Sequence, residues 1–215
     1  MSEIPILVDE PPAGKPVATI VLAHGAGAAM DSDFMEEVAH ALAAESLRVV
    51  RFEFPYMQEK RKSGRRGPPD SSAVLQETWL SVIGQIGPQP KLVIGGKSMG
   101  GRIASMIADR ANVHGLVCMG FPFHPPGRPT NLRVAHLKEL QTPTLILQGE
   151  RDTLGSRDDI AGYTLSPKIR LVFLPDGDHS FKPRKSSGRT YGQNLGDAVA
   201  ETAAFCRNLQ AVPLS

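Results

Sequence analysis

A serine flanked by glycines is the first group in this sequence that could do chemistry. Residues 96–100 read GKSMG, directly after an apolar run and directly before a segment of helical period. A sharp turn from strand to helix would hold the Ser98 hydroxyl exposed, and glycines two residues to either side are required because the turn leaves no room for Cβ atoms. The pattern predicts that Ser98 is a nucleophile that attacks acyl carbonyls.

A phosphate-binding loop is a competing interpretation of the same segment, because GGKS matches the end of the pattern G-x-x-x-x-G-K-S. In that register the first glycine would stand at position 91, where the sequence has Lys91. The residues that follow belong to the predicted strand rather than to a flexible cradle. Nucleotide binding is therefore disfavoured.

A serine nucleophile needs a base, and the base needs an acid that orients it. When the nucleophile lies on this type of turn, the acid and then the histidine follow it along the chain. Of six histidines, only His179 comes after the late apolar run 144–148, whose end continues as GERD. We expect Asp152 to be the acid, with Glu150 as the alternative, and His179 to be the base.

The oxyanion formed by attack on a carbonyl needs backbone N–H donors. Met99, the residue after the nucleophile, would supply one. The second is expected from the loop after residues 17–23, which reads HGAGA, with the Ala26 N–H as first choice and Gly27 as second. We expect His24 to bond to its own loop rather than to take part in the reaction.

Short apolar runs alternate along the chain with longer segments of helical period, which is typical of a mostly parallel sheet with crossover helices. Strands are predicted at 17–23, 47–54, 91–95, 115–119, 144–148 and 169–174, with a weaker one at 5–8. Helices are predicted at 34–46, 72–86, 99–111 and 195–210, and long Pro- and Gly-rich loops at 55–71 and 120–134. The pattern indicates an α/β fold with about seven strands, as a single domain over residues 1–215.

Composition agrees with a globular protein: 215 residues, 41% hydrophobic and 21% charged. No apolar run approaches the roughly 20 residues that span a bilayer, and the N-terminus has no signal-peptide core. Two cysteines, Cys118 and Cys206, do not make a disulfide framework. We expect a cytoplasmic protein without a membrane partner.

The net charge is only +2, but basic residues cluster in two segments. Residues 51–70 hold six basic and three acidic groups, and residues 182–189 hold four basic groups and no acid. Both segments follow predicted strands, so their loops should emerge at the carboxyl edge, where ligands bind. We expect Arg65, Arg66 and Lys97 to bind a small, anionic acyl substrate; the alternative is solvated surface charge. Nucleic acid is disfavoured because only Tyr191 interleaves with these charges.

The acidic run PDGDHSF could be taken for a calcium loop. The register fails at Ser180 and Phe181, where Asp or Asn and then Gly are required. We therefore expect neither a metal nor another cofactor.

The segments LAHGAG, FPYM, GRRGPPD, GGKSMGGR, LQGERD and GDHSF resemble the α/β-hydrolase superfamily, over about residues 20–205. They look like a small hydrolase-like family that includes bacterial proteins, a testis-expressed protein and the hydrolase-like part of a histone-acetyltransferase complex subunit; dienelactone hydrolase is a more distant likeness. The resemblance implies a three-layer α/β-hydrolase fold, with nucleophile Ser98, acid Asp152 and base His179. Lys97 stands where many lipases and esterases have His, which argues against a lipase.

Larger members of this fold insert a cap after the sixth strand, and here only residues 120–140 are available for one. We expect a minimal lid or none, and an open site. The expected function is that of a serine hydrolase, a carboxylic-ester hydrolase in particular, cleaving an ester, thioester or related acyl bond. The alternative is a hydrolase-like interaction module with a vestigial site. Peptide cleavage and acyl transfer would use the same residues, and no motif indicates the substrate or the oligomeric state.

Overall fold

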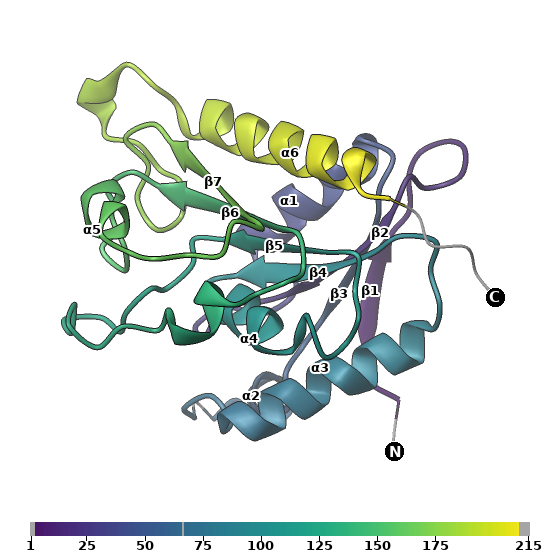
Figure 1. The fold of residues 1–215 in the computed structure, drawn as a ribbon. Helices are drawn as coiled ribbons and strands as arrows, with labels where there is room; N and C mark the ends of the chain where they lie inside the picture. The colour runs from purple at the N-terminus through teal and green to yellow at the C-terminus, as the bar shows by residue number, and fades with distance from the viewer. Residues whose placement is uncertain (1–2, 66, 211–215) are drawn as a thin grey trace.

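The computed structural model describes residues 3–65 and 67–210. Within them seven strands form one sheet in the order β1-β3-β2-β4-β5-β6-β7 (Figure 1). The strands are β1 (Ile6–Asp9), β2 (Thr19–Ala23), β3 (Arg48–Phe52), β4 (Leu92–Lys97), β5 (Gly115–Met119), β6 (Thr144–Gly149) and β7 (Ile169–Leu174). Only the β1–β3 pair is antiparallel. The carboxyl ends of β2 to β7 therefore share one edge of the sheet.

Helices cover both faces of the sheet, which makes three layers (Figure 1). One face carries α1 (Asp33–Ala44) and α6 (Tyr191–Asn208), and the opposite face carries α3 (Ser72–Ile86) and α4 (Met99–Ile107). Two shorter helices are α2 (Pro55–Ser63) and α5 (Arg157–Ala161), and 3-10 turns lie at Ala135–Lys138 and Lys185–Ser187.

Successive side chains of each strand point to opposite faces of the sheet, so the core has two parts. In β2, Ile20 and Leu22 pack with α1 and α6, whereas Val21 and Ala23 pack with α3 and α4. All four are fully buried. Strands covered on both faces are apolar at most positions, which is why they form nearly continuous apolar runs in the sequence. Packing on both faces holds these strands in place, and with them the carboxyl ends from which the site residues extend.

The strand predictions, including the weaker one near the N-terminus, are confirmed to within two residues. The prediction of a continuous loop at 55–71 was wrong, because its first half is helix α2. Pro55 opens the helix, the carboxylate of Asp70 accepts the Tyr56 N–H at 2.9 Å, and Gly64 ends it with φ 70°. These groups satisfy helix ends, although Met57 is the one buried residue of α2.

Two helix bounds also differ from the predictions. Helix α4 ends at Ile107 rather than near 111, and α6 begins at Tyr191, where Thr190 and Gln193 form a capping box. The loop predicted at 120–134 contains no helix or strand, and the Ala135–Lys138 turn stands where a lid would be inserted. None of the described helices is long and apolar enough to cross a membrane.

Candidate active site

Ser98 occupies the turn between β4 and α4 in a strained conformation, with φ 51° and ψ −116°. The flanking glycines are required by close backbone contact. A Cβ atom would lie 2.1 Å from the Ala23 carbonyl oxygen at Gly96 and 2.3 Å from it at Gly100. The turn can therefore pack against β2 only with glycine at both positions. Backbone strain of the kind seen at Ser98 is common at functional sites.

The side chains of Ser98, His179 and Asp152 form one hydrogen-bonded chain. His179 Nε2 lies 2.9 Å from Ser98 Oγ, and His179 Nδ1 lies 2.7 Å from Asp152 Oδ2. The carboxylate of Asp152 is an acceptor, so Nδ1 carries the proton and Nε2 is free to accept the serine hydroxyl. The structure thus brings together the three residues predicted from chain order, which come from the ends of β4, β6 and β7.

Gln148 is a member of this site that the sequence analysis missed. Its side-chain amide is fully buried and donates from Nε2 to Asp152 Oδ2 at 2.8 Å and to the Gly155 carbonyl at 3.0 Å. Its Oε1 accepts the Phe121 N–H at 2.8 Å. The Leu154 N–H, also at 2.8 Å, holds Asp152 Oδ1. The signal was present: a glutamine in an otherwise apolar buried strand requires hydrogen-bond partners.

Glu150, the alternative acid, is engaged elsewhere. Its carboxylate accepts the Asp176 N–H and the Arg157 guanidinium, each at 2.8 Å. The pKa of Glu150 is lowered, chiefly by the hydrogen bond from Asp176. Its oxygens therefore lie on this surface network, and Asp152 is the carboxylate that contacts His179.

The loop after β2 lies beside Ser98: a Cβ added at Gly25 would be 3.6 Å from the Ser98 Cβ. His24 accepts the Phe54 N–H at Nε2, 3.2 Å away, so its Nδ1 carries the proton and donates to the Gly25 carbonyl at 2.7 Å. Burial lowers the pKa of His24 and favours this neutral form. The expectation that His24 bonds to its own loop is confirmed.

Tyr56 holds the same loop from outside. Its hydroxyl donates to the Ala26 carbonyl at 3.0 Å, so helix α2, which the sequence analysis missed, helps to position the predicted oxyanion donors. Ala26, Gly27 and Met99 all line the cavity that contains Ser98 and His179. Their roles as donors stay predictions.

This cavity has a volume of about 600 Å³ and a mainly apolar lining that includes Phe34, Leu75 and Ile103. Lys97 also lines it, with Nζ donating to the His179 carbonyl oxygen and lying 5.5 Å from the centre of the Phe34 ring. Burial lowers the pKa of Lys97 to about 8. Lys97 is thus a cation packed under the histidine loop.

The other predicted substrate-binding residues are placed differently. Arg65 lines a separate groove along α2, with Tyr56, Glu59 and Lys62, and does not reach the Ser98 cavity. The physical reason is that residues 55–63 form helix α2, so Arg65 follows a helix instead of lying in the free loop that was expected directly after β3. Arg66 lies outside the described residues.

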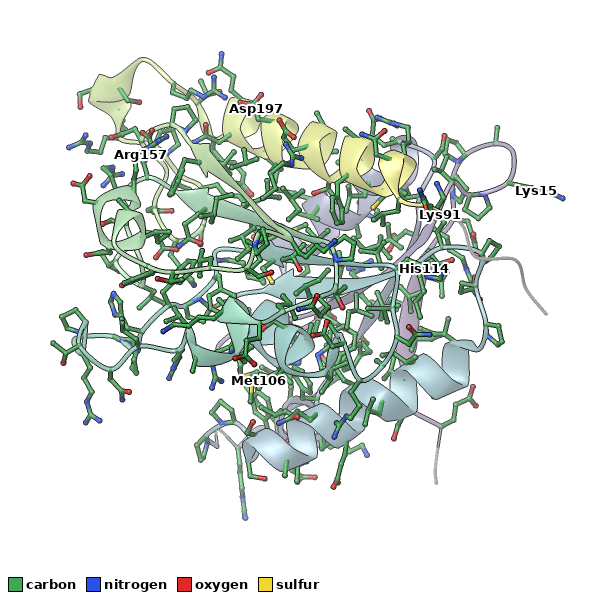
Figure 2. All side chains as sticks on the ribbon, viewed as in Figure 1. Lys15, Lys91, Met106, His114, Arg157 and Asp197 are labelled. Carbon is green, nitrogen blue, oxygen red and sulfur yellow. The ribbon has the colours of Figure 1, made fainter. Side chains whose placement is uncertain are left out.

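Both arginines of the second basic segment are paired with acids. Arg184 pairs with Asp176, and Arg189 with Asp197 on α6. Figure 2 labels Asp197 on the outer layer of the molecule, and Lys91 and His114 at the edge of the sheet opposite the site. Among the described arginines, Arg102 and Arg133 line the Ser98 cavity. Among the described residues no cluster of three His, Cys, Asp or Glu could hold a metal ion.

Comparison with known proteins gives one family match and many similar folds. The sequence model of the alpha/beta hydrolase domain family matches residues 16–207 of this chain. A lid-free α/β serine hydrolase from Xanthomonas campestris has a similar structure, with TM-score 0.70 and 21% identity over 97% of this chain and 90% of that one. So does the dienelactone hydrolase of Anabaena variabilis, with TM-score 0.69 and 20% identity over 95% and 91%.

Est1E from Butyrivibrio proteoclasticus is also similar, with TM-score 0.68 and 12% identity over 93% of both chains. At these identities the structural likeness concerns the fold: a seven-stranded, mostly parallel sheet between helices. It agrees with the fold expected from the sequence.

Proposed function

Because the chain belongs to the alpha/beta hydrolase domain family, we propose that it is a serine hydrolase that cleaves an ester, thioester or related acyl bond. The observation that supports this most is the hydrogen-bonded chain from Ser98 through His179 to the buried carboxylate of Asp152. Serine becomes nucleophilic at neutral pH when such a base accepts its proton. The strain at Ser98 and the cavity beside it also support a reactive role.

In the proposed reaction Ser98 Oγ forms a bond to the acyl carbon while His179 Nε2 takes the hydroxyl proton. Asp152 holds the imidazole in the tautomer that makes this transfer possible and stabilises the imidazolium. His179 then protonates the leaving oxygen or sulfur as its bond to the acyl carbon breaks. Water attacks the acyl-enzyme with His179 as base, which releases the acid and restores Ser98.

The negative charge on the tetrahedral oxygen would be stabilised by the backbone N–H groups of Met99 and of Ala26 or Gly27. One such donor is worth about 3–4 kcal/mol in other hydrolases. The hydrogen bonds from His24 and Tyr56 to carbonyls of the loop support this assignment, since they hold the loop in place before substrate binds.

We extend the proposal to the organisation of the chain. One sheet takes strands from Ile6–Asp9 to Ile169–Leu174, which supports a single domain. Cys118 and Cys206 are buried free thiols, which supports a reducing, cytoplasmic location. The quoted motifs support the narrower likeness to the family with the testis-expressed and histone-acetyltransferase-associated members.

A fluorophosphonate probe tests the proposed function directly. We expect the wild type to be labelled and to hydrolyse 4-nitrophenyl butyrate, and Ser98→Ala to do neither while keeping the same thermal unfolding curve. Ser180→Ala is the matched control, because Ser180 lines the same cavity beside His179; it should still be labelled. Folded wild type that resists the probe and the ester would contradict the proposal and favour an interaction module.

A further inference from the structure

Two arginines from distant parts of the chain meet in the cavity that contains Ser98. Arg102 lies one turn further along α4, and its N–H donates to the Ser98 carbonyl at 3.0 Å. Arg133 lies between β5 and β6, shortly before the 3-10 turn Ala135–Lys138, and its N–H donates to the Phe123 carbonyl at 2.7 Å. Both backbones are therefore anchored, one in the nucleophile helix and the other in a closed loop.

Neither guanidinium has an acidic partner, because the ion pairs formed among the described residues include neither Arg102 nor Arg133. Buried Arg51 behaves differently, because it is paired with Asp9 at 3.0 Å. The Nε–H of Arg102 is buried and finds no acceptor in the described part of the chain. Half-buried cations left without a carboxylate are unusual, because desolvation is costly unless a partner offsets it.

The two charges also act on each other. Burial lowers the pKa of both arginines, and the charge of Arg133 lowers the pKa of Arg102 further. Guanidinium groups nevertheless keep their protons at neutral pH. The pair therefore places two like charges in the cavity of the nucleophile, and an anion between the two groups would relieve their repulsion.

Neighbouring groups leave this charge in place. His136 near Arg102 is bound to Ser105 Oγ at 2.8 Å, and burial lowers its pKa, so it is neutral at pH 7. Asp70 brings one negative charge to the same lining, and its carboxylate accepts the Tyr56 N–H at the start of helix α2 rather than pairing with either arginine. Lys97 adds a further positive charge to the lining.

We propose that Arg102 and Arg133 bind a carboxylate group of the substrate, so that the enzyme selects esters that carry a negative charge. The proposal rests on the hydrolase function above and gives it a substrate class. The forked guanidinium donors match the two oxygens of a carboxylate. Four residues of helix, the separation of Ser98 and Arg102, rise about 6 Å, which places the anion site a short acyl chain or one aromatic ring away from the attacked carbonyl. This pair differs from Arg65, which the sequence analysis proposed as a ligand and which lines a separate groove.

Two matched ester pairs distinguish where the carboxylate is carried. Mono-4-nitrophenyl adipate and its methyl ester differ by a charge in the acyl part, and 4-acetoxybenzoate and its methyl ester differ by a charge in the leaving group. We expect the wild type to prefer the charged member of one pair in kcat/KM. Arg102→Met and Arg133→Met should each lower that preference roughly 10- to 100-fold, the value of one charge-assisted hydrogen bond. Arg102→Lys, which keeps the charge but not the fork, should fall in between.

Arg128→Met is the matched control, because Arg128 lies exposed on the same loop and outside the cavity. It should leave the preference unchanged. Equal kcat/KM within both pairs for the wild type, or an unchanged preference in both Met variants, would overturn the proposal.

Calorimetry on Ser98→Ala separates this inference from the proposed function. Adipate should bind to Ser98→Ala, and adding Arg102→Met should weaken that binding by at least tenfold while thermal unfolding shows an intact fold. If the fluorophosphonate fails to label the wild type but adipate binding still depends on Arg102, the hydrolase function is wrong and the anion site stands. If labelling succeeds and neither binding nor preference depends on the arginines, the anion site is wrong and the hydrolase function stands.

Discussion

Lys97 makes the stability of this protein depend on pH in a way that one substitution can isolate. Its ammonium lies under the His179 loop, and burial lowers its pKa from the ordinary 10.5 to about 8. Between these two values the unfolded chain binds more protons than the folded one, so the free energy of unfolding must rise with pH across this window. Below about pH 8 both states are protonated, and the folded state carries the full cost of the buried charge.

The expected size follows from the width of the window. At about 1.4 kcal/mol per pH unit the two pKa values correspond to about 3 kcal/mol, and contact of the side chain with the cavity reduces this to about 2–3 kcal/mol. Lys97→Met has no proton to lose. The wild type should therefore gain about 2–3 kcal/mol of stability relative to Lys97→Met between pH 7 and pH 10.5.

Urea unfolding at several pH values measures this difference, and the fluorescence of the single, fully buried Trp79 reports it. Groups other than Lys97 titrate in both proteins, so their contributions cancel in the difference. Lys168→Met, at an exposed lysine, should run parallel to the wild type. A difference between wild type and Lys97→Met that stays flat from pH 7 to 10.5 would refute the reasoning, because it would mean that the ammonium is solvated.

Three further substitutions test the site and its frame. Asp152→Asn should lower kcat for 4-nitrophenyl butyrate by roughly 10³- to 10⁴-fold through the wrong histidine tautomer, whereas Glu150→Gln, on the surface network, should keep kcat within a few-fold. Gly96→Ala should lower the free energy of unfolding by about 3 kcal/mol or more, because its Cβ would lie 2.1 Å from a carbonyl oxygen of β2; Gly84→Ala, with nothing within 4 Å, should leave it unchanged or raise it by up to about 1 kcal/mol. Gln148→Leu should cost about 2–4 kcal/mol in urea unfolding, since it leaves a buried backbone N–H unpaired; an unchanged midpoint would contradict that role.

Most of the sheet was predictable because the inner strands, such as β2, β5 and β6, are buried on both faces and therefore appear in the sequence as continuous apolar runs. Ser98, Asp152 and His179 were predictable because each follows a strand of the sheet and the strand ends share an edge. Helix α2 was not, because its stability comes from end groups rather than from an apolar face. Pro55 and Gly64 were visible in the sequence, but the carboxylate that caps it lies fourteen residues away.

The anion site illustrates a different limit. Nothing in the sequence singled out Arg102, which lies in a predicted helix, or Arg133, which lies in a predicted Pro-rich loop. Their meeting depends on the closure of that loop by the Arg133 N–H and the Phe123 carbonyl. The sequence analysis assigned the anion contact to Arg65, Arg66 and Lys97 because they follow predicted strands. Lys97 does line the cavity, whereas Arg65 follows helix α2 and lines a separate groove.

The order of the strands divides the site between the middle of the sheet and its border. Ser98 follows the central strand β4, and the loop beside it follows β2. His179 follows β7, which is an edge strand next to β6 and is half exposed. An edge strand separates from its one neighbour without disturbing the centre of the sheet, so an opening of β7 would detach the base and leave the nucleophile turn intact. The reaction would then stop while the rest of the sheet is still folded.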